Sequence, residues 1–228
     1  MDTNQLNKNK QGTLSKTQEG LEGYSKELFA QWAELTQGGD RACKWLSQRI
    51  EELQRSLGKT AIYSNALNEV RHSEIPEGSW RWKPVMQNEY IQAGFLQLAA
   101  GASIPFHDHP ASIDVMRVLD GTVELRSYSP STDIVTIGKQ AAHLKPVNYQ
   151  RLENQDISIV FPNLGNIHGL RCLGNPAILF DVQVCNDPSI ERRWYFPLGA
   201  ANNDPGHVIA AAVPESLLRS AIGCQNRE

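Results

Sequence analysis

The stretch GASIPFHDHPASIDVMRVLDG, residues 101–121, decides the fold and indicates where a site lies. It contains two of the six histidines of the chain, His107 and His109, with Asp108 between them. Because side chains alternate along a β-strand, the two imidazoles are predicted to face one side and Asp108 the other. Imidazoles on one face of a strand can hold a first-row transition metal between them. The stretch therefore predicts a strand that supplies part of a metal site.

The spacing around this pair resembles the first motif of the cupins, G-x5-HxH-x3/4-E-x6-G. Five residues separate Gly101 from His107, four separate His109 from Asp114, and six separate Asp114 from Gly121. Glycine at both ends suits the sharp turns of a small barrel. Asp114 stands where the motif has glutamate. The pattern predicts an all-β cupin domain, that is, a jelly-roll barrel or double-stranded β-helix.

A third ligand is predicted from the segment DISIVFPNLGNIHGLRC, residues 156–172. Its His168 follows a strand and a Pro/Gly turn, which resembles the second cupin motif with one extra residue between Pro162 and Gly165. The two motifs face each other across the barrel in such folds. We expect His168 to complete a three-histidine metal site; the alternative is a hydrogen-bonded loop histidine. The remaining histidines lie outside both motifs: His72, His143 and His207.

The chain divides into three predicted parts. Residues 1–20 contain almost no large apolar side chain and are expected to be a disordered tail. Residues 21–60 are expected to form helices that pack outside the barrel, because apolar residues recur there at helical spacing. Residues 61–228 are assigned to the cupin domain, with a short helix at PESLLRSAIG. Its strands are expected at YIQAGFLQLA, VMRVLDGTVELRSY, DIVTIG, DISIVF and AILFDVQV.

The bulk properties exclude several classes of partner. A net charge of -3 gives no electrostatic reason to expect nucleic acid or an anionic membrane. No apolar run approaches the roughly 20 residues that a membrane helix needs. The four cysteines are scattered and do not form a disulfide or zinc pattern. The N-terminus is polar throughout, so a cytoplasmic location is expected.

The segment from about Tyr90 to Phe196 resembles the thiol dioxygenase family of cysteamine dioxygenase and the plant cysteine oxidases. The resemblance is carried by ASIPFHDHP, VLDGTVELRSY, VFPNLGNIHGL, AILFDVQV and RRWYFPL. It implies Fe(II) held by the three histidines at 107, 109 and 168. It also implies insertion of both atoms of O2 into a small thiol, such as cysteine, cysteamine or a mercapto acid, to give a sulfinate.

The same resemblance implies two catalytic residues. Asp181 matches the acid of the family's "LDV" strand and is expected to orient substrate or a ligand. Tyr195 matches one of the terminal aromatic pair and is expected at the pocket. The alternative for Asp181 is a hydrogen-bonded acid at the centre of a strand.

The chain departs from the family in three places. Asp114 is acidic where these enzymes have no acid; with one methylene fewer than glutamate, it is expected not to be an obligatory ligand. No cysteine accompanies Tyr195 in RRWYF, so no thioether is available there. The family's "PPY" loop is replaced by VCNDPS.

Two other functions stay open. One is a metal-dependent cupin dioxygenase with a carbon substrate and Asp114 as fourth ligand. The other is a non-catalytic ligand-binding cupin.

A substrate carboxylate would need an arginine in the pocket, and the candidates are Arg117, Arg126 and Arg171. The oligomeric state is not predicted.

Overall fold

The computed structural model describes residues 48–49, 51–52, 55–56, 58–87, 91–131, 141–162, 165–185, 187, 189–200 and 206–221. The predicted tail over 1–20, most of the predicted helical segment over 21–60, and the predicted strand DIVTIG lie outside these residues. The described residues between 48 and 56 are helical. Within the described part, no helix is long and apolar enough to cross a membrane.

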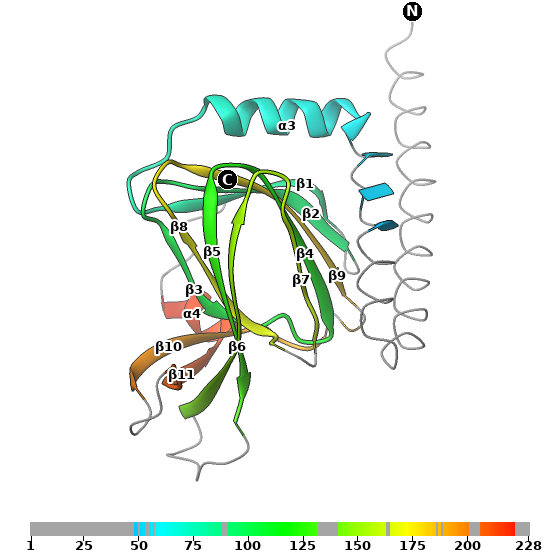
Figure 1. Cartoon of the computed structure of the whole chain (residues 1–228). Helices are drawn as coiled ribbons and strands as arrows, with labels where there is room; N and C mark the ends of the chain where they lie inside the picture. Colours follow the sequence, from blue (N-terminus) through cyan, green and yellow to red (C-terminus); the bar gives the residue numbers. More distant parts are fainter. Residues whose placement is uncertain are drawn as a thin grey trace, which may run out of the picture.

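Two antiparallel sheets build the domain. The first contains β1 (Trp80–Gln87), β2 (Ile91–Leu98), β9 (Ala177–Cys185), β4 (Ser112–Asp120) and β7 (Ile157–Val160), in that spatial order. The second closes on itself in the order β10 (Arg193–Ala200), β11 (Val208–Pro214), β6 (Ala141–Glu153), β5 (Thr122–Pro130), β8 (Ile167–Cys172) and β3 (Ser103–His107). Helix α3 (Ala61–His72) runs across one end of the body, and the β10–β11 hairpin projects from the other, near α4 (Glu215–Ala221) (Figure 1). The predicted all-β cupin fold is confirmed.

The outer face of the first sheet is covered by α3. Helix α3 begins after Thr60, whose Oγ1 accepts a hydrogen bond from the Tyr63 backbone N–H at 3.2 Å, a standard N-cap. The Tyr63 ring packs against Phe95 and Phe180, with ring centroids 4.9 and 5.3 Å away. Further buried residues of this cluster are Ala66, Val70, Ile91, Ala93, Ile113, Val115, Ile178, Val182 and Val184. This helix is therefore packed as part of the barrel domain.

The inner faces of the sheets divide the barrel interior into two parts. One part is an apolar cluster that includes Leu96, Leu98, Met116, Val118, Val123, Leu125, Leu152, Leu170 and Leu179. In the other part, β4 contributes Asp114 and β9 contributes Asp181 and Gln183, which line a cavity. One face of β4 contributes to both parts, because Asp114 and Met116 lie two residues apart on this strand and therefore face the same side. The apolar part fixes the barrel, and the polar part forms the site.

The glycines of the first motif lie at turns, as predicted. Gly101 has φ 69° and Gly121 has φ 79°, a left-handed conformation that glycine adopts without strain. At Gly121 a Cβ atom would also lie 2.6 Å from the Pro176 carbonyl oxygen. Gly121 therefore permits the tight connection from β4 to β5.

Candidate metal centre

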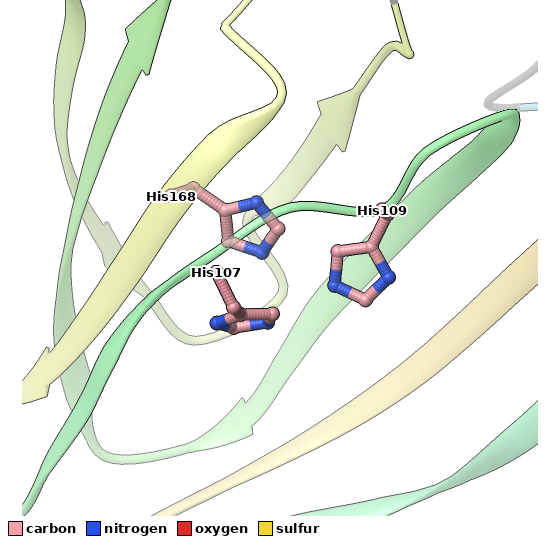
Figure 2. A group of neighbouring side chains, drawn as sticks. All are labelled: His107, His109 and His168. Atoms are coloured by element: carbon pink, nitrogen blue, oxygen red, sulfur yellow. The ribbon is translucent and has the colours of Figure 1, made fainter. Parts of the chain in front are cut away.

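Three imidazoles converge inside the barrel (Figure 2). His107 ends β3, His168 lies opposite it on β8, and His109 follows in the connection to β4. One nitrogen from each ring can be chosen so that all three lie within 4.8 Å of one another. The three side chains are 1 to 7% exposed.

The prediction that both motif histidines lie on the strand is wrong for His109: β3 ends at His107. A register shift between Ile104 and His107 accompanies this end of the strand.

Hydrogen bonds orient two of the rings. His107 Nδ1 lies 2.9 Å from the Pro105 carbonyl oxygen, and His168 Nδ1 lies 3.2 Å from that of Asn166. Since a carbonyl oxygen can only accept, each Nδ1 carries the proton, and each Nε2 keeps its lone pair for a metal. Backbone carbonyls of this kind commonly fix metal-binding histidines.

The third ring, His109, has a different environment. Its Nδ1 lies 3.2 Å from Nη2 of Arg192, and the side chain of Gln183 is a second hydrogen-bonding neighbour of the ring. Its buried Nε2 has no hydrogen-bond partner among the described residues. A buried polar atom without a partner is costly, and a metal ion in the centre of the triad would satisfy it. The residues present therefore fit a transition metal.

The electrostatics of the triad favour metal binding. Burial lowers the pKa of His107 and of His109 well below the usual histidine value, and it also lowers the pKa of His168. Metals bind the neutral imidazole, so a lowered pKa reduces the competition from protons at neutral pH.

Two aspartates from neighbouring strands, Asp114 on β4 and Asp181 on β9, line the same cavity as the three histidines. Asp114 Oδ2 lies 3.6 Å from His109 Nε2 and 3.5 Å from His168 Nε2, and the side chain is almost fully buried. Asp181 hydrogen-bonds to Asp114, and its pKa is raised well above the usual value, first by burial and then by the Asp114 charge. Burial and the Asp114 charge therefore favour the protonated, hydrogen-bond-donating form of Asp181.

The triad opens into a cavity of about 290 Å³. Trp80, Trp82 and Trp194 form an aromatic wall, and the Trp194 ring centroid lies 4.8 Å from that of His107. A hollow of about 460 Å³ shares Gln183, Arg192 and other lining residues with this cavity. The two together offer a polar approach to the triad for a small molecule.

Tyr195 does not line this cavity. Its hydroxyl donates to Asp108 Oδ2 at 2.8 Å, and the backbone N–H of Arg193 donates to Asp108 Oδ1 at 2.7 Å. As predicted, Asp108 points away from its two histidine neighbours. Asp108 thus ties strand β10 to the segment that carries His107 and His109, with Tyr195 behind the site and Asp181 inside it.

The arginine that reaches the cavity is one that the sequence reasoning missed. Arg117 pairs with Glu51, while Arg126 and Arg171 line a separate hollow with Glu124. Arg192 lines the cavity instead and donates to Gln183 Oε1 at 3.0 Å. It is the first residue of RRWYFPL, a segment whose resemblance to the family rests on its aromatic pair and assigns no role to this arginine. Gln183 could have been found from the sequence, because it lies two residues after Asp181 on one strand.

Comparisons with known proteins give the following likenesses. The model of the plant cysteine oxidase/cysteamine dioxygenase family (PCO_ADO) matches residues 58–188, more than half of the chain. No curated protein matches. Among solved structures, a cupin superfamily protein from Desulfitobacterium hafniense is 13% identical at a TM-score of 0.37, covering 51% of this chain and 87% of that one.

Two further solved structures are similar to the same extent. The cupin domain of Cnp3 from Schizosaccharomyces pombe is 15% identical at a TM-score of 0.37, covering 51% of this chain and 72% of that one. TT1209 from Thermus thermophilus is 22% identical at a TM-score of 0.38, covering 50% and 91%. These distant likenesses say nothing about activity. The match of the family model over residues 58–188 includes all three histidines. The chain therefore belongs to the plant cysteine oxidase/cysteamine dioxygenase family of thiol dioxygenases.

Proposed function

We propose that this protein is an Fe(II)-dependent thiol dioxygenase that converts a small thiol, such as cysteine, cysteamine or a mercapto acid, to its sulfinate. The observation that carries the proposal is the triad of buried imidazoles inside the region that the family model matches. In the reaction, a thiolate and O2 combine to give the sulfinate. Sulfur is oxidised by the same number of electrons that O2 takes up, so no further reductant is needed.

Iron would be held by His107, His109 and His168, where it would bring thiolate and O2 together and accept electron density from sulfur. The tryptophan wall would exclude bulk water from the reacting groups. Asp181 would supply a proton-bearing group inside the cavity and orient Asp114. Arg192 and Glu215, whose Nε and Oε2 are 3.9 Å apart, line both hollows and would meet the part of the substrate remote from sulfur.

The proposal is tested with iron-loaded protein and an oxygen electrode. We expect O2 consumption that depends on a thiol, with a panel of cysteine, cysteamine, 3-mercaptopropionate and peptides with an N-terminal cysteine. The sulfinate is identified by mass spectrometry. If none of these thiols is oxidised by fully iron-loaded protein, the thiol dioxygenase proposal is wrong.

A second candidate function is a cupin dioxygenase with a carbon substrate. The observation that favours it is the proximity of the Asp114 carboxylate to two of the histidines. Oxygen consumption with a flavonol or an acireductone, together with inactivity toward every thiol of the panel, would support this candidate instead.

The role proposed for Tyr195 is to position the histidine segment through Asp108. Tyr195→Phe removes one of the donors to a buried carboxylate, which costs about 1–3 kcal/mol of stability. We expect metal affinity to fall by roughly 10-fold, at the low end of what is typical for groups that orient ligands. The measurement is the metal dissociation constant by competition with a chelator.

The matched control is Tyr149→Phe, which removes a hydroxyl that donates to Glu124 at 2.9 Å outside the cavity. Metal affinity should not change in this variant. If Tyr195→Phe kept full metal affinity and lost only kcat, Tyr195 would act on the substrate and the positioning role would be wrong.

A further inference from the structure

Asp114 faces a nitrogen lone pair on His168 without a proton between them. His168 Nδ1 carries the ring proton, so the His168 Nε2 that lies 3.5 Å from Asp114 Oδ2 is a bare acceptor. His109 Nε2, at 3.6 Å from the same oxygen, has no hydrogen-bond partner among the described residues. Acceptors that converge in a buried place repel one another unless a cation lies between them.

The distances agree with a shared cation. Ligand atoms about 2.0–2.2 Å from one transition metal, at ligand–metal–ligand angles between 90° and the tetrahedral angle, are separated by about 2.8–3.6 Å. Asp114 Oδ2 has nearly this separation from both nitrogens. The carboxylate is almost fully buried, and its Oδ1 has no hydrogen-bond partner in the described part of the chain.

The strand next to β4 supports this carboxylate. Asp181 lies on β9, which pairs with β4, and hydrogen-bonds to Asp114. A hydrogen-bonded neighbour of this kind orients a ligating carboxylate.

We propose that Asp114 is a fourth protein ligand of the metal held by the three histidines, so that a thiol binds this metal beside O2 through its sulfur alone. Three imidazoles and one carboxylate leave two positions of an octahedral ion, one for a thiolate and one for O2. While O2 holds one of these positions, an amino group of the thiol has none on the metal. This reverses the expectation from the length of the aspartate side chain, because β4 brings the carboxylate close to two of the ligating nitrogens.

The metal part of the inference is tested without turnover. Dissociation constants for Fe(II), kept anaerobic, and for Co(II) are measured by competition with a chelator. We expect Asp114→Ala and the isosteric Asp114→Asn to bind both metals at least about 100-fold more weakly, since even groups that only orient ligands cost 10–100-fold. Asp114→Glu, which keeps a carboxylate, should lose less than about 10-fold.

The matched control is Glu124→Gln, which removes the charge of another buried carboxylate outside the cavity. Circular dichroism checks that each variant is folded. Asp114→Asn and Asp114→Glu are included because they disturb the packing around this residue least. Metal affinities of Asp114→Asn and Asp114→Ala that match the control would overturn the inference.

The thiol part rests on the proposed function and uses the Co(II) protein saturated with azide, which takes the position left for O2. Thiolate-to-cobalt charge-transfer absorption gives dissociation constants for ethanethiol and for cysteamine, which differ in the amino group that could chelate. We expect similar constants in the unchanged protein. Tighter cysteamine binding with charge-transfer and ligand-field bands that show nitrogen coordination would overturn the sulfur-only mode.

Loss of metal in Asp114→Asn without thiol oxidation by iron-loaded protein would refute the proposed function and leave the ligand assignment standing. Thiol oxidation by the iron-loaded protein, with no effect of Asp114→Asn on metal affinity, would support the proposed function and refute the assignment of Asp114 as a ligand.

Discussion

Replacing His168 with alanine is expected to abolish tight metal binding. The side chain is 1% exposed, lies opposite His107 across the β3–β8 pairing, and directs its unprotonated Nε2 into the triad. Removing it takes away one nitrogen ligand and the neighbour that lies 3.5 Å from Asp114 Oδ2, so two imidazoles and a displaced carboxylate would have to hold the metal. His107→Ala and His109→Ala are expected to have the same effect. The measurement is metal content after dialysis against a chelator.

The chain supplies two histidine controls for this experiment. His143 and His207 contact each other, with ring centroids 5.1 Å apart, and neither lines the cavity of the triad. His143→Ala and His207→Ala should therefore retain metal. Full metal content in His168→Ala, combined with loss in either control, would show that the assignment of the third ligand is wrong.

The second large effect is expected on folding. Phe180 lies on β9 at the centre of the cluster under α3, where its ring centroid is 5.3 Å from both Tyr63 and Phe95. Phe180→Ala opens a cavity in this core, and we expect the free energy of unfolding to fall by about 3–5 kcal/mol. Chemical denaturation followed by circular dichroism gives this value.

Phe196→Ala is the matched control, because this ring on β10 is 36% exposed. It should cost less than about 1 kcal/mol, as is usual for surface positions. Equal losses in the two variants would contradict the packing of α3 on the first sheet described above.

The barrel could be predicted from the sequence because its strands are short apolar or β-branched runs separated by turn residues. Segments such as YIQAGFLQLA and AILFDVQV became β2 and β9, and the motif glycines lie at turns with positive φ. Their apolar residues occupy both faces, since α3 covers one side and the barrel interior the other. The spacing of the two motifs also brought together the three histidines.

Other parts of the site depend on geometry that spacing does not encode. The HxH pattern predicted a continuous strand, but β3 ends at His107 after a register shift, and His109 lies in the connection. Arg192 precedes β10 and reaches the cavity, although the resemblance of RRWYFPL assigned no role to this arginine. Side-chain length alone could not place the Asp114 carboxylate, because its reach depends on where β4 runs relative to β8.

The most direct test of the central claim is turnover under ¹⁸O2. Iron-loaded protein is incubated with the thiol that gives the fastest O2 consumption, and the product is analysed by mass spectrometry. We expect both oxygen atoms of one sulfinate to carry the label, with no label lost to water. A product with one labelled atom or none, or the absence of any thiol-dependent O2 consumption, would contradict the assignment of this protein as a thiol dioxygenase.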